Sequence, residues 1–208
     1  NIEYVENRLF QDEIYLSNSG KLRNLGWRTK RTLKETLPVL VDWYTKNPEF
    51  FIPYKKVSSF YWMHYKFLKA AIDEAKKSYT EGGIPIGSVI VYNGKIIGRG
   101  HNKRVQNQSA ILHGEMDALE NAGRLKASVY KECTLYTTLS PCSMCSGTIL
   151  LYGIPKVIIG ENKTFMGEEE LLKSRGVKVN VVNDSECYNL MTKFIQEKPE
   201  LWNEDIGE

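Results

Sequence analysis

Apolar and polar residues follow one pattern before about residue 60 and another after it. The first part alternates turn-like pieces with a single helical stretch, predicted over about Leu33 to Lys46. Prolines at positions 48 and 53 follow this stretch and indicate a linker, because proline interrupts regular backbone structure. We therefore expect a small, mostly helical N-terminal appendage over residues 1–60 and a separate domain over residues 61–208.

In the second part the pattern alternates between the period of helices and that of strands. From about Tyr61, apolar residues recur with helical spacing until Glu81-Gly82-Gly83. Two apolar runs then flank Asn93-Gly94, a typical two-residue hairpin turn. Further strands are predicted from about 133, 156 and 178, and helices over about 113–122, 142–152, 168–174 and 185–197. Such alternation after an opening hairpin predicts a three-layer α/β/α domain with a central five-stranded mixed sheet.

Composition places the chain among ordinary globular proteins, and its charge is unevenly distributed. Of its 208 residues 42% are hydrophobic and 25% charged, and no apolar run approaches the roughly 20 residues that span a bilayer. Residues 1–60 hold 10 Lys and Arg against 7 Asp and Glu, whereas residues 61–208 hold 18 of each. The second part therefore has no net field that would attract nucleic acid. The basic cluster of the first part is interpreted as a solvated helix start: Arg28, Lys30, Arg31 and Lys34.

The start of the chain and its cysteines indicate the compartment. The first residues do not form a secretory signal, so we expect a cytoplasmic protein, with the nucleus as a second compartment, that does not contact membranes. The chain does not begin with Met, and we expect it to be part of a longer one. In a reducing compartment free or metal-bound thiols are favoured over disulfides. The cysteines are Cys133, Cys142, Cys145 and Cys187.

Two of these cysteines have the spacing of metal ligands. Cys142 and Cys145 share one face at the start of a predicted helix, where the helix dipole favours thiolates, and Pro141 is expected at the first helical position. His113 also begins a predicted helix, so two helix starts can bring one imidazole and two thiolates to a single Zn²⁺. The two remaining cysteines lie on separate elements without motif spacing, and we expect them to be structural.

Glu115 lies two residues after His113 and completes a known pattern. H-x-E followed by P-C-x-x-C is the signature of the zinc-dependent nucleobase deaminases. Three protein ligands leave a fourth position for water, which zinc activates at neutral pH. Glu115 is then expected to act not as a ligand but as the proton shuttle between this water and the leaving group. Iron or another divalent ion remains an alternative to zinc, although thiolate ligands favour zinc.

Longer segments of the second part resemble the fungal-type cytosine deaminases. The similar segments are "EGGIPIG", "GRGHN", "LHGE", "LYTTLSPCSMC", "YGIP", "GEN" followed by Phe165, and the tail "LWNEDIGE". They cover most of residues 61–208. The resemblance implies hydrolysis of free cytosine to uracil and ammonia in pyrimidine salvage. It also implies a homodimer with one zinc per subunit, held by His113, Cys142 and Cys145, and Glu115 as the proton shuttle.

The same resemblance implies how cytosine would be held. Asn102 and the backbone of Gly114 would bind the ring, the Ser140 carbonyl would accept from the exocyclic amine, and Asp205 would reach the leaving amino group. Aromatic and aliphatic side chains would stack on the base and cover it from a C-terminal helix. The complete implied set is Ile86, Asn102, Gly114, Leu139, Ser140, Phe165, Trp202, Asp205 and Ile206. The chain departs from the family at Asn203, where an aromatic residue is usual, and in a shorter hairpin and a shorter loop after Phe165.

Three other functions share parts of this pattern. A tRNA adenosine deaminase has the same zinc core but needs cations for RNA phosphates, whereas residues 61–208 are neutral and end in the acidic "NEDIGE". A cytidine deaminase must leave room for ribose, and a C-terminal helix that closes over the base would leave too little space for it. A non-enzymatic zinc module would need neither Glu115 nor Asn102.

Residues 1–51 resemble a different family, the C-terminal tail of nucleotide-sugar 4,6-dehydratases. The residues that carry this resemblance are Arg8, Asp12, Tyr15, the "KLRNLGW" turn and Trp43-Tyr44, with Ile14 at a position that is basic in that family. The chain has no G-x-G-x-x-G, so it cannot perform the dehydratase reaction alone. We interpret it as a fusion in which a dehydratase domain lies upstream, with a retained packing arm as the alternative.

Overall fold

The computed structural model describes residues 24–26, 28, 32–46 and 59–208. Contacts divide the chain into two units, Asn1–Lys55 and Lys56–Glu208. Arg8, Asp12, Ile14, Tyr15, Lys30, Arg31 and the two linker prolines lie outside the described residues. Within those residues no helix is both long and apolar enough to cross a membrane.

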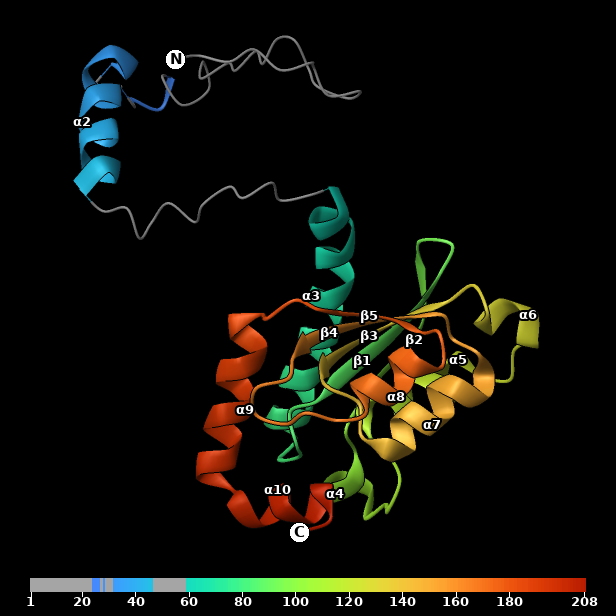
Figure 1. Cartoon of the computed structure of the whole chain (residues 1–208). Helices are drawn as coiled ribbons and strands as arrows, with labels where there is room; N and C mark the ends of the chain where they lie inside the picture. The colour runs from blue at the N-terminus through green and yellow to red at the C-terminus, as the bar shows by residue number, and fades with distance from the viewer. Residues whose placement is uncertain (1–23, 27, 29–31, 47–58) are drawn as a thin grey trace. The chain divides into compact units, whose positions relative to one another are not determined.

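The first unit contains helix α2, Leu33–Lys46, with the predicted bounds (Figure 1). Its start is a capping box: the Glu35 backbone N–H donates to Thr32 Oγ1 at 3.3 Å, and the Thr32 N–H donates to Glu35 Oε2 at 2.7 Å. This reciprocal pairing satisfies amides that the first turn leaves without helical partners.

The second unit is built on a sheet whose strand order is β2-β1-β3-β4-β5. β1 (Gly87–Tyr92) pairs antiparallel with both β2 (Lys95–His101) and β3 (Thr134–Leu139). β4 (Lys156–Glu161) and β5 (Lys178–Val181) continue the sheet in parallel. At the predicted hairpin turn Asn93 and Gly94 have φ of 47° and 71°, and such positive φ values suit the twist of two-residue hairpins.

Helices cover both faces of this sheet (Figure 1). One face packs on α3 (Ser59–Thr80) and α9 (Ser185–Glu197), and the buried apolar residues of α3 include Phe67, Ala70, Ala71 and Ala75. The other face packs on α5 (Gly114–Ala122), α7 (Ser143–Tyr152) and α8 (Glu169–Ser174). The expected three-layer α/β/α architecture with a five-stranded mixed sheet is therefore confirmed.

Three helices lay outside the periodicity prediction. α4 (Arg104–Asn107) and α6 (Ala127–Tyr130) span about one turn each, too little chain for a helical period to be visible. α10 (Pro199–Ile206) follows α9 after the single residue Lys198 and was implied only by the family resemblance. Pro199 occupies its first turn, where its missing N–H leaves no helical bond unmade. α10 adds Trp202 to a core cluster with Ile86 and Leu139 at the end of β3.

Candidate active site

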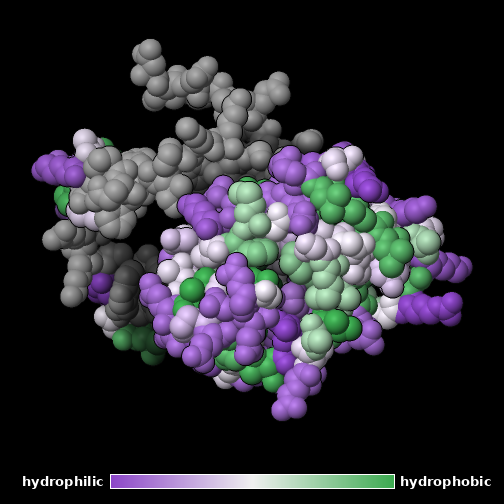
Figure 2. Space-filling model, turned by 60° about the horizontal axis from the view of Figure 1, so that its bottom comes forward, coloured by the Kyte–Doolittle hydropathy of each residue, from purple (hydrophilic) through white to green (hydrophobic). Residues whose placement is uncertain are grey.

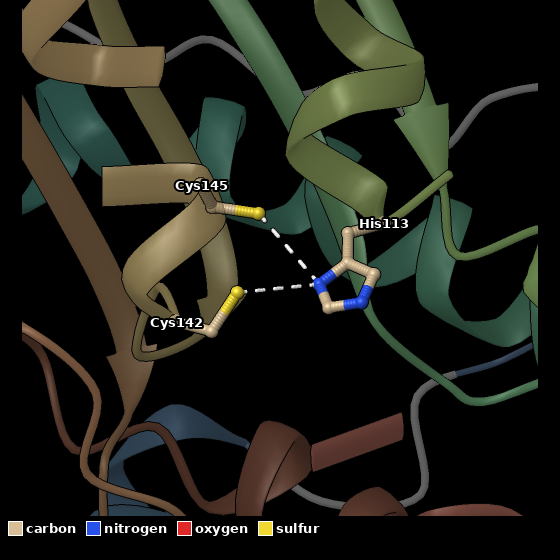
Figure 3. A group of neighbouring side chains, drawn as sticks. All are labelled: His113, Cys142 and Cys145. Carbon is tan, nitrogen blue, oxygen red and sulfur yellow. Dashed lines mark hydrogen bonds between the residues drawn. The ribbon is translucent and has the colours of Figure 1, made fainter. Parts of the chain in front are cut away.

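Two helix starts carry the predicted metal ligands. His113 is the N-cap of α5, and Cys142 is the N-cap of α7, both with extended backbone. Cys145 lies in the first turns of α7, on the side that faces His113 (Figure 3). One expectation was wrong: α7 begins at Ser143, so Pro141 precedes the cap and is not the first helical residue. The Pro141 carbonyl instead accepts from the Glu168 backbone N–H at 2.9 Å and ties α7 to the segment before α8.

The distances from the imidazole nitrogen to the two sulfur atoms are those of a tetrahedral zinc site. His113 Nδ1 lies 3.5 Å from Cys142 Sγ and 3.7 Å from Cys145 Sγ, and all three atoms lie within 4.8 Å of one another (Figure 3). Bond lengths of about 2.3 Å to sulfur and 2.0–2.1 Å to nitrogen place tetrahedral ligands about 3.5–3.8 Å apart. The residues present therefore fit a zinc ion with three protein ligands.

The two thiols of this group differ in acidity. Hydrogen bonds from Cys145 and from His113 lower the pKa of Cys142 to about 4. The shared hydrogen bond with Cys142, together with burial, raises the pKa of Cys145. A thiolate ligand is thus available at neutral pH. The other two cysteines are buried and belong to other parts of the core, and burial raises the pKa of Cys133 to about 11.

Glu115 lies beside the metal ligands and is only 4% exposed. Thr137 Oγ1, from β3, donates to its Oε1 at 3.0 Å, and the Cys145 thiol lies 3.4 Å from its Oε2. Burial raises the pKa of the Glu115 carboxyl above its usual range, and the Cys142 thiolate adds to the effect. One carboxylate oxygen is thus held by the sheet, while the other faces the thiols.

A narrow pocket opens next to these residues. Its volume is about 20 Å³, room for little more than one water molecule. Its lining is mostly the set that the family resemblance implied: Ile86, His113, Glu115, Leu139, Ser140, Cys142, Phe165, Trp202, Asp205 and Ile206. Phe165 and Trp202 meet edge to face, with ring centroids 5.9 Å apart. An outer cavity of about 400 Å³ continues from it past Arg104 and Met166.

Asn102 and Gly114 do not line this pocket, although both lie next to it. Asn102 Nδ2 donates to Asp205 Oδ1 at 2.9 Å, so its side chain lies behind the carboxylate. Asp205 Oδ1 also lies 3.7 Å from His113 Nε2. Gly114 begins α5, and a Cβ there would come within 3.0 Å of the Ile86 carbonyl oxygen. This close approach packs the start of α5 against Ile86, which lines the pocket.

Arg104 is a site residue that sequence reasoning missed. Its Nη1 donates to Asp205 Oδ1 at 3.1 Å and to the Glu204 carbonyl at 2.9 Å, which ties α4 to α10. The only sequence signal was a basic residue two positions after Asn102 in a chain with an acidic tail.

Two buried carboxylates that hold the Phe165 loop were also missed. Glu161 accepts from the backbone N–H groups of Lys163 and Thr164, at 2.7 and 3.1 Å. Glu169 accepts from Ser140 Oγ and from Asn162 Nδ2, both at 2.9 Å. Nothing in their local sequence distinguishes them from solvated acidic residues.

Known proteins resemble the second unit in sequence and in fold. Residues 62–161 match the cytidine and deoxycytidylate deaminase zinc-binding region. A cytosine deaminase of Candida albicans is 63% identical over 144 residues, which cover 69% of this chain and 96% of that protein. A tRNA-specific adenosine deaminase of Bacillus subtilis is 37% identical over 141 residues, which cover 63% of this chain and 88% of that protein.

Among solved structures, a guanine deaminase from Nitrosomonas europaea superposes with a TM-score of 0.53 at 19% identity. The superposition covers 62% of this chain and 82% of that one, and it supports the fold alone. The expected resemblance of residues 1–51 to a dehydratase tail is not borne out by these comparisons.

Proposed function

The chain belongs to the zinc-dependent cytidine and deoxycytidylate deaminase family, and on that premise we propose that it hydrolyses free cytosine to uracil and ammonia. The observation that carries this proposal is the narrow pocket beside the His-Cys-Cys group, roofed by Trp202 and Ile206 of α10. A planar base without sugar or phosphate would suit a narrow slot with apolar walls and convergent polar groups, which this pocket would become once α10 moves. The 63% identical relative bears the name cytosine deaminase, and we transfer that activity to this chain.

His113, Cys142 and Cys145 would hold the zinc ion. Bound zinc supplies a nucleophilic hydroxide from water at neutral pH. Water attacks the ring carbon that carries the amino group; the new C–O bond replaces the C–N bond, and ammonia leaves. Glu115 would take one proton from water and deliver it to the ring nitrogen. After the addition it would take the second proton, from the new hydroxyl group, and deliver it to the amino group, so that the C–N bond breaks, a C=O bond forms and ammonia leaves. Thr137 holds Oε1 of Glu115, which leaves Oε2 on the thiol side as the oxygen that would carry both protons in turn.

The remaining pocket residues would position the base and exclude water. The Ser140 carbonyl and Asp205 would accept from the exocyclic amine. Asn102 and the backbone of Gly114, which do not line the closed pocket, would reach the ring once α10 and its Asp205 move. Phe165 and Trp202 would pack against the base, with Ile86, Leu139 and Ile206 completing the apolar wall. Since the closed pocket has room for little more than a water molecule, α10 would have to move to admit cytosine.

We further propose a homodimer. The end of α7 leaves apolar side chains unburied, with Leu151 78% and Tyr152 41% exposed. They border a cavity of about 440 Å³ lined also by Met116, Leu125 and Tyr130. Figure 2 shows hydrophobic surface on the side where Figure 1 places α6 and α7. A second copy of this chain would cover this face, since apolar surface of this kind is typical of subunit contacts.

A cytoplasmic role in pyrimidine salvage agrees with the thiol chemistry. All four cysteines are free, and zinc requires the thiolate form of two of them. A reducing compartment keeps the cysteines out of disulfides and leaves the two thiolates available to zinc. We also propose that the deaminase unit begins near residue 60, with residues 1–60 as a separate appendage.

The test measures ammonia release by zinc-loaded protein from three substrates: cytosine, cytidine and a tRNA anticodon stem. We expect turnover of cytosine only. Activity on the tRNA stem with none on cytosine would favour the function named for the 37% identical relative. No turnover of any substrate by the full chain with zinc bound would favour a non-enzymatic zinc module.

A further inference from the structure

Asp117 is a buried carboxylate that the proposed chemistry does not use. It lies in α5 and is 4% exposed, yet it is not a metal ligand and does not line the pocket. An ionised carboxylate is costly to bury unless charges or hydrogen bonds compensate it. Its partners therefore indicate why the fold keeps it there.

Those partners are the two residues on either side of Asn102. The His101 backbone N–H donates to Asp117 Oδ2 at 3.0 Å, and Lys103 Nζ donates to Oδ1 at 2.9 Å. Asn102 itself donates its backbone N–H to the Ile86 carbonyl at 2.8 Å. The side chain of Asp117 thus holds both flanks of the residue that would bind the pyrimidine ring.

The backbone of Asp117 is joined to the metal ligand. Its N–H donates to the His113 carbonyl at 2.9 Å in the first turn of α5. One residue consequently links the Asn102 segment to the helix that carries both His113 and Glu115. The link is short because β2 lies directly on α5: a Cβ on Gly100 would come within 2.1 Å of the Ala118 backbone nitrogen.

We propose that Asp117 is a positioning residue that sets the distance between the base-binding Asn102 and the proton shuttle Glu115. This inference rests on the proposed function. A displacement of the order of 1 Å in such a site can cost about a hundredfold in rate, so a rigid connection has catalytic value. Lys103 neutralises the carboxylate and holds it in this place, with its own side chain 26% exposed.

The test compares Asp117→Asn with Asn121→Ala. Asn121 lies on the same helix and donates from Nδ2 to the Arg99 carbonyl of the same strand at 2.7 Å, away from Asn102. We expect Asp117→Asn to lower kcat/KM for cytosine about tenfold at unchanged zinc content, chiefly through KM, because a misplaced Asn102 removes binding that the substrate and the transition state share. Asn121→Ala should lower thermal stability only. Equal KM values in both variants and the wild type would overturn the proposal.

Two further measurements keep the test decisive. Lys103→Met should give a smaller loss than Asp117→Asn, and the double variant should be no worse than Asp117→Asn alone, because both changes act on one contact. Additive losses would contradict this coupling. Amide hydrogen exchange at His101 to Lys103 should accelerate in Asp117→Asn without any substrate. If the wild-type chain is inactive on cytosine but exchange is still faster in Asp117→Asn, the proposed function is refuted and the restraint by Asp117 is demonstrated. Unchanged exchange in the variant would refute the restraint itself.

Discussion

Single side chains at the site have separable duties, and Glu115 is the one assigned to proton transfer. Glu115→Gln keeps the size of the side chain and its contact with Thr137 but cannot carry the proton. We expect turnover of cytosine to fall by about 10²–10⁴, the usual contribution of a general acid–base residue, with zinc content and folding unchanged. Steady-state ammonia release and metal analysis check both parts.

The control is Glu120→Gln, an exposed acidic residue of the same helix. It should leave turnover unchanged. Full activity of Glu115→Gln would show that another group moves the proton.

The cysteines allow a second residue-level comparison. Cys142→Ser replaces a ligand whose pKa is about 4 by a hydroxyl that stays protonated, so we expect loss of both zinc and activity. Cys133→Ala, in the core beneath α6, should retain one zinc per chain. Metal content after dialysis measures the difference. Equal zinc retention by the two variants would remove Cys142 from the ligand set.

At the scale of elements, α10 is the proposed cover of the pocket, and contacts from α4 hold it in place. Arg104 bonds the Glu204 carbonyl and the Asp205 carboxylate, while Trp202 packs against Phe165. The Arg104 side chain is 23% exposed and the Asp205 side chain 2%, so water weakens this pair only in part. Charge-assisted hydrogen bonds of this kind contribute about 1.5–3 kcal/mol.

Arg104→Gln should therefore shift α10 toward an open state. We expect KM for cytosine to rise about tenfold or more, while kcat does not fall if opening limits product release. Arg99→Gln is the matched control, since Arg99 forms a half-exposed pair with Glu74 at 3.7 Å, outside the pocket lining. A KM that is the same in both variants would mean that Arg104 does not hold the cover.

At the scale of the whole molecule, the proposed dimer depends on the apolar end of α7. Leu151 is 78% exposed in the single chain, so the fold should tolerate the charge that Leu151→Lys introduces. An apolar contact between two copies should not tolerate this charge. Sedimentation equilibrium at micromolar concentration should give a dimer mass for the wild type and a monomer mass for the variant. Tyr188→Ser, at an exposed aromatic of α9, should remain dimeric. A monomeric wild type would contradict the interface.

Elements with a clear local signal were predicted correctly. The bounds of α2 and α9 agree with the prediction, and the Asn93-Gly94 turn joins β1 and β2 as expected. One-turn helices such as α4 escaped notice because four residues do not display a period. The predicted start of α7, about residue 142, lies one residue before the observed start at Ser143. Pro141 precedes the N-cap, a place that proline can occupy as well as the first helical position.

The sequence by itself determined the class of chemistry and the order of layers. Metal ligands sit at fixed local spacings on helix starts, and the apolar period of each segment decides which face it buries. The tertiary structure alone decided that Arg104 meets Asp205 and that Asp117 holds both flanks of Asn102. Arg104 and Asp205 lie 101 positions apart in the sequence. Asp117 reaches its partners only because β2 packs closely against α5. Contacts of this kind depend on how packed elements meet, which no local pattern encodes.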